Sequence, residues 1–301
     1  MQNNHDPQCR CLERQGPPPF VTRRVHQLDD GRVAIWSARH HRKGLSLPES
    51  LALGEIRLAF RRCWWRLDDL NWWIGFLFLA GSGLFIAGSI LTLWPSFDQS
   101  IALLPSQVFF IGSLPFTCAA YLQFHQAVNA TNFPLSEPPP IQNKLFGCRP
   151  TEIGWWSCLL QFLGTLLFNL STYSAMNESL GWVSQDVWVW TPNMVGSILF
   201  LASGYLAFAE TCHAYFRWLP GNLSWCVVAL NLVGCIGFLT SAFLAVLVSD
   251  ATPTIRFEVS VWFTLLGAVG FLASSMLLFP EAALKENKQV HSVPEKSESS
   301  Q

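Results

Sequence analysis

Six long runs of apolar residues, separated by short polar connections, dominate the middle of the chain. Each run is rich in Leu, Phe, Gly and Ala and holds about 20 residues or more, the length that a helix needs to cross a bilayer. Because lipid offers no hydrogen bonds to an exposed backbone, such segments are stable only as helices. The sequence therefore predicts six membrane-spanning helices, at residues 71–94, 105–128, 155–176, 192–212, 224–249 and 258–279.

Composition supports this interpretation, because half of the residues are hydrophobic and only 13% are charged. A soluble domain carries about 25% charged residues. Nearly all Lys and Arg precede Leu67 or follow Pro280, so a basic N-terminal tail precedes an almost uncharged body. Attraction of this juxtamembrane basic segment to anionic lipid headgroups accounts for the tail more simply than a nucleic-acid partner does.

The distribution of basic residues also predicts the orientation. All of the 19 Lys and Arg residues except Arg256 lie in the N-terminal segment, the second and fourth connections and the C-terminal segment. Basic residues concentrate on the cytoplasmic side of membrane proteins. We therefore expect a multi-pass protein of the cell membrane (plasma or inner membrane) with both termini in the cytoplasm.

A shared pattern recurs in alternate spans. The second, fourth and sixth spans each carry a Gly followed four residues later by Phe, at Gly112/Phe116, Gly196/Phe200 and Gly267/Phe271. The odd-numbered spans share Trp, then Gly nine residues on and Phe four further, at Trp72/Gly81/Phe85, Trp155/Gly164/Phe168 and Trp225/Gly234/Phe238. Small residues allow helices to approach closely in lipid. The predicted fold is an all-α transmembrane six-helix bundle of three parallel two-helix repeats, at about 68–128, 151–213 and 221–283.

The segments outside the bundle are polar. Residues 1–47 are predicted to be a mostly disordered basic cytoplasmic tail, with a small hairpin between Val25 and Trp36 as a local exception. Residues 48–67 place apolar side chains at helical spacing, which predicts an amphipathic helix in the cytoplasmic interface or packed beneath the bundle. Residues 284–301 are predicted to be a disordered cytoplasmic tail.

Glu210 is the acidic residue that lies most clearly inside an apolar span, and intramembrane ionisable residues are candidates for function. Gln126 and Glu281 occupy the equivalent repeat positions, and His125 and His213 lie near them in the sequence. These five residues form a candidate polar ring near the cytoplasmic end. The alternative is that they meet water at the interface or cap neighbouring helices.

Three further polar residues, Gln161, Asn169 and Asn231, lie deeper in the spans. Hydrogen bonds between helices, worth about 1 kcal/mol or less each, are one use for them. The lining of a pore is the other.

The sequence predicts no enzyme, metal site or cofactor. A serine nucleophile requires a nearby base, and after His213 the next histidine is His291 in the C-terminal tail. The motifs of zinc proteases and phosphate-binding loops are also missing from the sequence.

The first hairpin resembles a known family. Residues 109–116 read FFIGSLPF, and residues 84–91 read LFIAGSIL. Together they are similar to the paired-helix YrhK-like domain of bacterial membrane proteins, over about 60 residues. The third repeat departs from the motif, with Gly267-Ala268 in place of Gly-Ser. The resemblance implies a membrane fold and location and transfers no site.

Two functions remain open from the sequence. The first is a membrane scaffold that acts through protein partners, lipids or membrane organisation. The second is a channel or transporter for a small neutral or apolar solute along the pseudo-threefold axis, because the spans lack central charge. A polar ring that faces one axis beside a water-filled cavity would favour transport. A ring whose residues lie at the periphery of the bundle would favour the scaffold.

Overall fold

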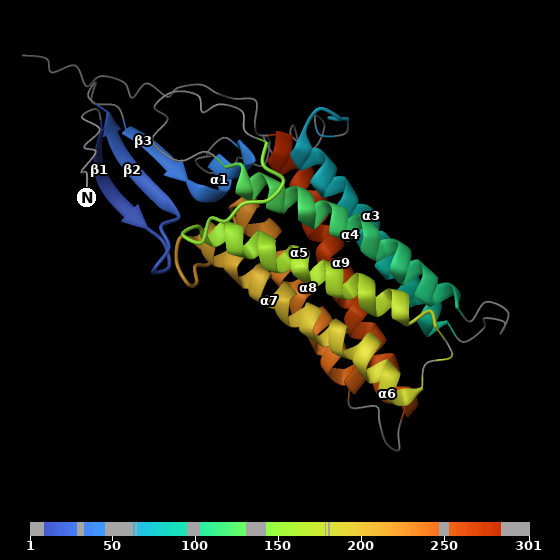
Figure 1. Ribbon diagram of the computed structural model, residues 1–301. Coiled ribbons are helices and arrows are strands. Elements are labelled where there is room, and N and C mark those ends of the chain that lie inside the picture. The colour runs from blue at the N-terminus through green and yellow to red at the C-terminus, as the bar shows by residue number, and fades with distance from the viewer. Residues whose placement is uncertain are drawn as a thin grey trace, which may run out of the picture.

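The computed structural model describes residues 9–28, 33–45, 63, 65–94, 103–130, 143–177, 179, 181–246 and 253–283 (Figure 1). Six of its helices are long and apolar enough to cross a membrane, which confirms the predicted multi-pass bundle. They are α3 (Leu70–Leu93), α4 (Leu104–Val128), α5 (Ile153–Ser174), α7 (Thr191–Cys212), α8 (Leu223–Val246) and α9 (Pro253–Ala283). A short helix, α6 (Trp182–Gln185), and a π-helical turn, η2 (Asp186–Trp190), lead into α7.

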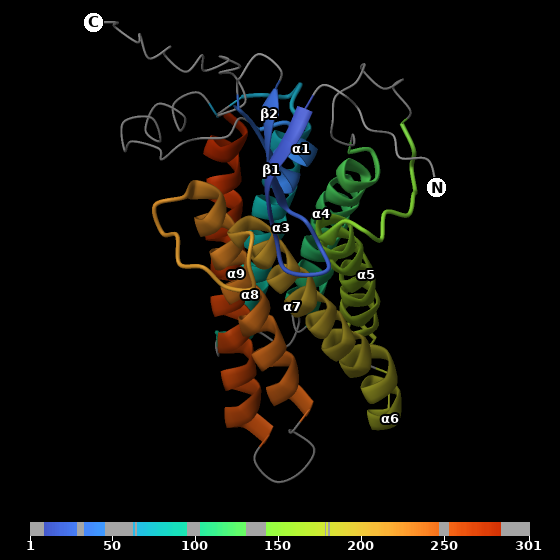
Figure 2. The same cartoon turned by 90° about the vertical axis from the view of Figure 1, so that its left-hand side faces the viewer.

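Consecutive long helices pack in pairs, α3 with α4, α5 with α7 and α8 with α9 (Figures 1 and 2). Each pair meets at a glycine that faces the Phe and Gly of its partner helix. A Cβ atom added to Gly81 would overlap the Phe116 ring and lie 2.9 Å from the Gly112 carbonyl oxygen. The corresponding close contacts in the other pairs join Gly164 to Phe200 and Gly196, and Gly234 to Phe271 and Gly267.

The phenylalanines of these contacts gather into one cluster at the centre of the bundle. Rings from the three pairs meet edge-on or tilted, with centroids 5.5 Å apart for Phe85 and Phe238 and 5.7 Å apart for Phe116 and Phe271. Such geometry is favourable for aromatic rings. The six-phenylalanine cluster comprises Phe85, Phe116, Phe168, Phe200, Phe238 and Phe271.

The first long helix of each pair is tied to the segment before it by a tryptophan. The indole nitrogens of Trp72, Trp155 and Trp225 donate to backbone carbonyls eight or nine residues upstream, at 3.0, 2.8 and 2.8 Å. The acceptors are the carbonyl oxygens of Cys63, Gly147 and Arg217. Buried indole N–H groups require such partners, so these bonds fix how the chain enters each pair.

The N-terminal segment folds, contrary to the expectation that residues 1–47 are mostly disordered. Strands β1 (Cys9–Gln15), β2 (Arg23–Leu28) and β3 (Val33–Ser37) form an antiparallel sheet in that order, followed by helix α1 (Ala38–Lys43). The predicted hairpin is confirmed, because β2 pairs with β3 with Val25 opposite Ile35. The expectation of disorder was wrong for residues 9–28 and 33–45, because composition does not reveal contacts with the distant bundle.

Those contacts hold the sheet and α1 at one end of the bundle (Figure 2). Thr22 is fully buried, and its hydroxyl lies 2.9 Å from Nδ1 of His213, at the end of α7. The Tyr215 hydroxyl donates to the Pro18 carbonyl at 3.1 Å. The predicted amphipathic helix at 48–67 lies outside the described residues apart from Cys63 and residues 65–67, and the tail at 284–301 lies outside them entirely.

Two glycines two residues apart test the packing of α3 on α4. Gly81→Ala is expected to lower the free energy of unfolding by about 1–3 kcal/mol, because the added methyl group meets Phe116 and a backbone oxygen. Gly83→Ala is the matched control, since nothing lies within 4 Å of its added Cβ, and it should change stability by about 0.5 kcal/mol or less. Thermal unfolding in detergent measures both, and equal destabilisation would contradict the close approach at Gly81.

Candidate functional site

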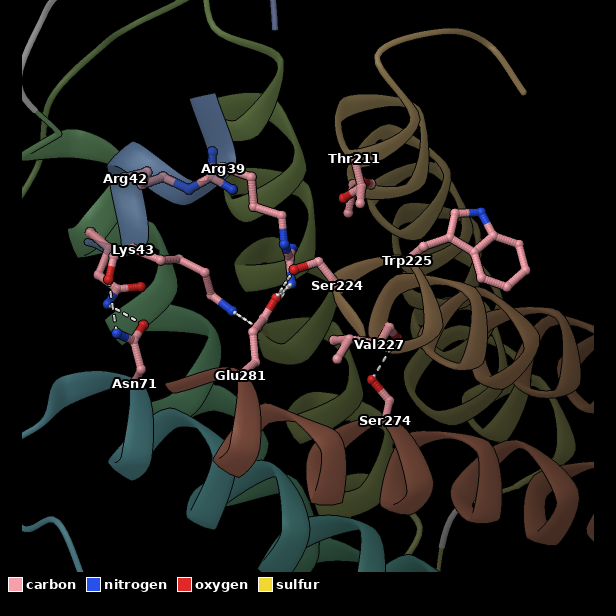
Figure 3. Close-up of polar contacts among 12 residues, drawn as sticks. Arg39, Arg42, Lys43, Asn71, Thr211, Ser224, Trp225, Val227, Ser274 and Glu281 are labelled. Carbon is pink, nitrogen blue, oxygen red and sulfur yellow. Dashed lines mark hydrogen bonds and ion pairs between the residues drawn. The ribbon is translucent and has the colours of Figure 1, made fainter. Parts of the chain in front are cut away.

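Helix α1 lies across the ends of the long helices and points three cationic side chains into the bundle (Figure 3). The sequence Ala38–Lys43 supplies Arg39, Arg42 and Lys43, one helical turn or less apart. Gly44 ends the helix in a left-handed conformation, which glycine adopts without strain. The three cations therefore project from one short helix, which directly follows strand β3 and ends at Gly44.

Glu281, near the end of α9, accepts hydrogen bonds from two of these cations. Nη2 of Arg39 lies 3.1 and 3.3 Å from its two carboxylate oxygens, and Nζ of Lys43 lies 2.6 Å away. The Ser224 hydroxyl of α8 donates a fourth bond at 2.7 Å. The carboxylate is 2% exposed, so its charge is balanced by these partners and not by water.

Glu210, near the end of α7, pairs with the third cation. Arg42 donates from both terminal nitrogens to the two carboxylate oxygens, at 2.7 and 2.9 Å. This forked geometry is specific to arginine. Gly154 of α5 provides the space, because a Cβ atom there would lie 2.6 Å from Glu210 Oε1 and would overlap the guanidinium.

The first helix pair contributes a neutral link to α1. Nε2 of Gln126 donates to Oδ1 of Asn71 at 3.0 Å, and Nδ2 of Asn71 donates to the Lys43 carbonyl at 2.9 Å. Gln126, Glu210 and Glu281, the core of the predicted polar ring, therefore lie at one level around α1. They are buried or half-buried and do not splay to the rim.

The two histidines of the predicted ring lie apart from these pairs. His213 ends α7 in a left-handed conformation and contacts Thr22 of the N-terminal sheet segment. His125 packs beside the Tyr121 ring, with centroids 6.4 Å apart, and its carbonyl accepts a bond from Asn129. Neither imidazole pairs with a ring carboxylate in the part of the chain that the structure describes.

Burial shifts the pKa values of several groups on and beside α1. Burial, reinforced by the neighbouring Arg39, lowers the pKa of Lys43 to about 8, although Glu281 acts in the opposite direction. Burial also lowers the pKa of His40 to about 4 and the pKa of His213 to about 4. Burial acts to lower the pKa of Arg42 too, but its pair with Glu210 outweighs this and raises it. At pH 7 Arg42 and Lys43 are therefore charged, and His40 and His213 are neutral.

A cavity of about 60 Å³ lies on the inner side of α1. Helix α1 and all six long helices contribute to its lining, so it lies on the axis of the bundle. The polar side chains along it are Arg39, Arg42, Lys43, Gln123, Gln126, Ser157, Gln161, Asn231, Ser274 and Ser275. Phe271 belongs both to this lining and to the six-phenylalanine cluster, which encloses a gap of only about 10 Å³. The axis is thus polar beside α1 and closed by aromatic rings further in.

The deeper polar residues divide between two roles. Gln161 and Asn231 line the cavity, whereas Asn169 does not and donates instead to the Thr117 hydroxyl of α4 at 2.9 Å. Gln161 is 92% buried and makes no hydrogen bond to any described residue. An amide without a partner in a buried lining is available to a solvent molecule or a ligand.

Helix α1 is not apparent from the sequence. A run of basic residues outside a span, such as that of Arg39, Arg42 and Lys43, is typical of a solvated segment and predicts a disordered tail. The available signal was the match between this run and two carboxylates, Glu210 in a predicted span that carries no cation and Glu281 just after the predicted span 258–279. Buried charges are paired, so Glu210 and Glu281 required cations from elsewhere in the chain.

The pair of Arg42 and Glu210 can be tested by a double-mutant cycle. Arg42→Met should lower the free energy of unfolding by about 3–5 kcal/mol, because it leaves a buried carboxylate without its partner. The double variant Arg42→Met/Glu210→Met should recover most of that loss, since it replaces both charges by apolar groups. Thermal or denaturant unfolding in detergent measures the cycle. A double variant no more stable than Arg42→Met would contradict a direct pair.

Acidification is expected to weaken the attachment of α1 and the sheet. The folded-state pKa values of His40 and His213 lie below the ordinary 6.5, so the detached state binds protons that the docked state does not. Their contribution is complete above pH 6.5 and is lost as the pH falls towards 4, by up to about tenfold in the docking equilibrium per pH unit per histidine. Limited proteolysis of the N-terminal segment between pH 7 and 4.5 measures this, and His40→Gln should flatten the profile. If the His40→Gln variant shows the same pH dependence of proteolysis as the wild type, His40 is excluded as a source of that dependence.

Comparison with models of protein families, with curated proteins and with solved structures finds no match for this chain. The resemblance of the first hairpin to the YrhK-like domain therefore stays a prediction.

Proposed function

We propose that this protein forms a gated path for a small polar solute across the membrane, and that the structure corresponds to its closed state. The observation that carries the proposal is the polar cavity on the bundle axis, to which α1 and all six long helices contribute. Scaffolds do not require a polar cavity at their centre, whereas pathways are built from polar groups that line an axis.

The closed state has two barriers in this proposal. Helix α1 covers the end of the cavity that faces the N-terminal sheet. The ion pairs of Arg42 with Glu210, and of Arg39 and Lys43 with Glu281, hold it there. The six-phenylalanine cluster blocks the axis further in. Opening would require α1 to leave and the rings to separate, and constrictions of apolar side chains gate conduction in channels by excluding water.

The architecture that we propose is three tandem copies of one helix hairpin. Three kinds of contact recur in the three pairs and support it. These are the glycine–phenylalanine approach, the indole bond to the preceding segment, and a polar residue of the second helix that faces the start of the first. The last contact joins Gln126 to Asn71 and Glu281 to Ser224, with Glu210 beside Gly154.

The orientation that we propose has both termini in the cytoplasm, from the concentration of basic residues. Helix α1 then closes the cytoplasmic mouth, and the path runs from there towards the opposite face of the cell membrane. We assign no catalytic role, cofactor or metal to the chain. Anionic lipid headgroups are the expected partners of the basic juxtamembrane segment.

A scaffold function is the second candidate, and one surface favours it. Val33 and Ile35 of β3 are exposed on the sheet, together with Leu12 of β1. Exposed apolar side chains on a small sheet are a common feature of surfaces that bind partners. On this alternative the bundle anchors the sheet, and α1 is a rigid connection.

Flux into proteoliposomes distinguishes the two functions. The double variant Glu210→Gln/Glu281→Gln removes both carboxylates that hold α1. It should raise the entry of urea or sodium formate at least several-fold over the wild type, because the first of the two barriers is then absent and only the phenylalanine rings oppose entry. Glu152→Gln is the matched control, since Glu152 pairs with Arg149 at the same end of the bundle but is one-third exposed. Flux equal to that of protein-free vesicles in both proteins would overturn the pathway and leave the scaffold.

A further inference from the structure

We infer that the cavity beneath α1 is a binding site for a small monovalent anion. This inference rests on the proposed function, because it names the class of solute that the path would accept. It also changes the expectation from the sequence, which favoured a neutral or apolar solute because the spans carry almost no charge. Helix α1 brings charge to the axis that the spans lack.

The charged side chains that line the cavity are all cationic among the residues that the structure describes. Arg39, Arg42 and Lys43 line it, and no carboxylate belongs to its lining among the residues that the structure describes. The two carboxylates that pair with these three cations leave one positive charge in excess. His40 adds none, because burial holds its pKa at about 4. An uncompensated charge in a buried site is costly, and a bound anion would remove that cost.

Several hydrogen-bond donors of residues that line the cavity are unused. Nε of Arg39 is buried and has no hydrogen-bond partner. The amides of Gln123 and Gln161 line the cavity and make no bond to any described residue. An arginine nitrogen and amide N–H groups are donors to anions, and arginine has no acceptor at all. Residues of α1, α4 and α5 that line one cavity therefore carry these unused donors.

The size of the cavity limits the ion that it can hold. A cavity needs a volume of about 10–15 Å³ to hold a single water molecule. The cavity of about 60 Å³ therefore admits an ion of one to four atoms together with some water. Chloride, nitrate and formate meet this limit. A lipid headgroup or a sugar acid is too large. The excess of a single charge favours a monovalent ion over phosphate or sulfate.

Thermal unfolding of the full-length protein in detergent tests the inference, with sodium chloride, sodium nitrate and sodium gluconate compared at equal ionic strength. Chloride or nitrate should raise the unfolding midpoint in a saturable manner, by about 3 °C at ten times the dissociation constant. Gluconate does not fit and should leave the midpoint unchanged. A shift of the same size with gluconate, or no saturable shift with any of the salts, would overturn the inference.

Two variants of α5 locate the site. Gln161→Glu places a carboxylate in the cavity, so the protein should no longer respond to chloride, and Gln161→Leu should weaken the response. Asn169→Leu is the matched control, because it removes an amide from the same helix outside the cavity and should keep the full response. A chloride response that survives Gln161→Glu unchanged would place the ion elsewhere and refute this site.

Flux measurements separate failure of the inference from failure of the proposed function. Entry of urea through the Glu210→Gln/Glu281→Gln variant, without any chloride response in unfolding, would refute the anion site and keep the pathway. A saturable chloride response that Gln161→Glu abolishes, without flux in any variant, would keep the site and refute the pathway.

Discussion

The arrangement of the whole molecule depends on the pairing of three cations from α1 with two carboxylates at the end of the bundle. Glu210 and Glu281 are 0% and 2% exposed, so neither can remain charged without partners inside the protein. The same constraint applies in reverse to Arg39, Arg42 and Lys43, which would be fully hydrated in a free tail. The three cations and the two carboxylates therefore stabilise each other as ion pairs. Hence α1, and the sheet attached to it, has one position on the bundle.

The consequences extend along the axis. Because α1 rests on the ends of the helices, the space beneath it is a lined cavity and not an open mouth. Because glycines allow each pair of helices to approach closely, the six phenylalanines can meet at the centre and close the space beyond. Charge at one end and close apolar packing in the middle thus divide the bundle into a polar part and a sealed part.

The features that the sequence predicts are those that depend on residues close together in the chain. The six helices were predictable because length and hydropathy act within one segment, and the β2–β3 hairpin was predictable because it is local. The level of Gln126, Glu210 and Glu281 followed from aligning the spans. Their partners did not, because the pair of Arg42 with Glu210 spans 168 positions and leaves no local pattern.

The same limit explains the error over the N-terminal segment. Residues 9–15 lack the alternation of a half-buried strand, and β1 is ordered by its pairing with β2 and by contacts such as that of Thr22 with His213. A distant neighbour decided the outcome there. Asn169, by contrast, makes one of the two contacts predicted for it, a hydrogen bond between helices to the Thr117 hydroxyl.

Amide hydrogen exchange across residues 36–45, with the protein in lipid nanodiscs at pH 7, tests the central claim most directly. A docked α1 held by buried ion pairs predicts exchange slowed by several orders of magnitude relative to the same sequence as a free peptide, comparable to amides in the sheet. Exchange at the rate of the free peptide would show that α1 is detached, and would contradict the account of the cavity and its closed mouth.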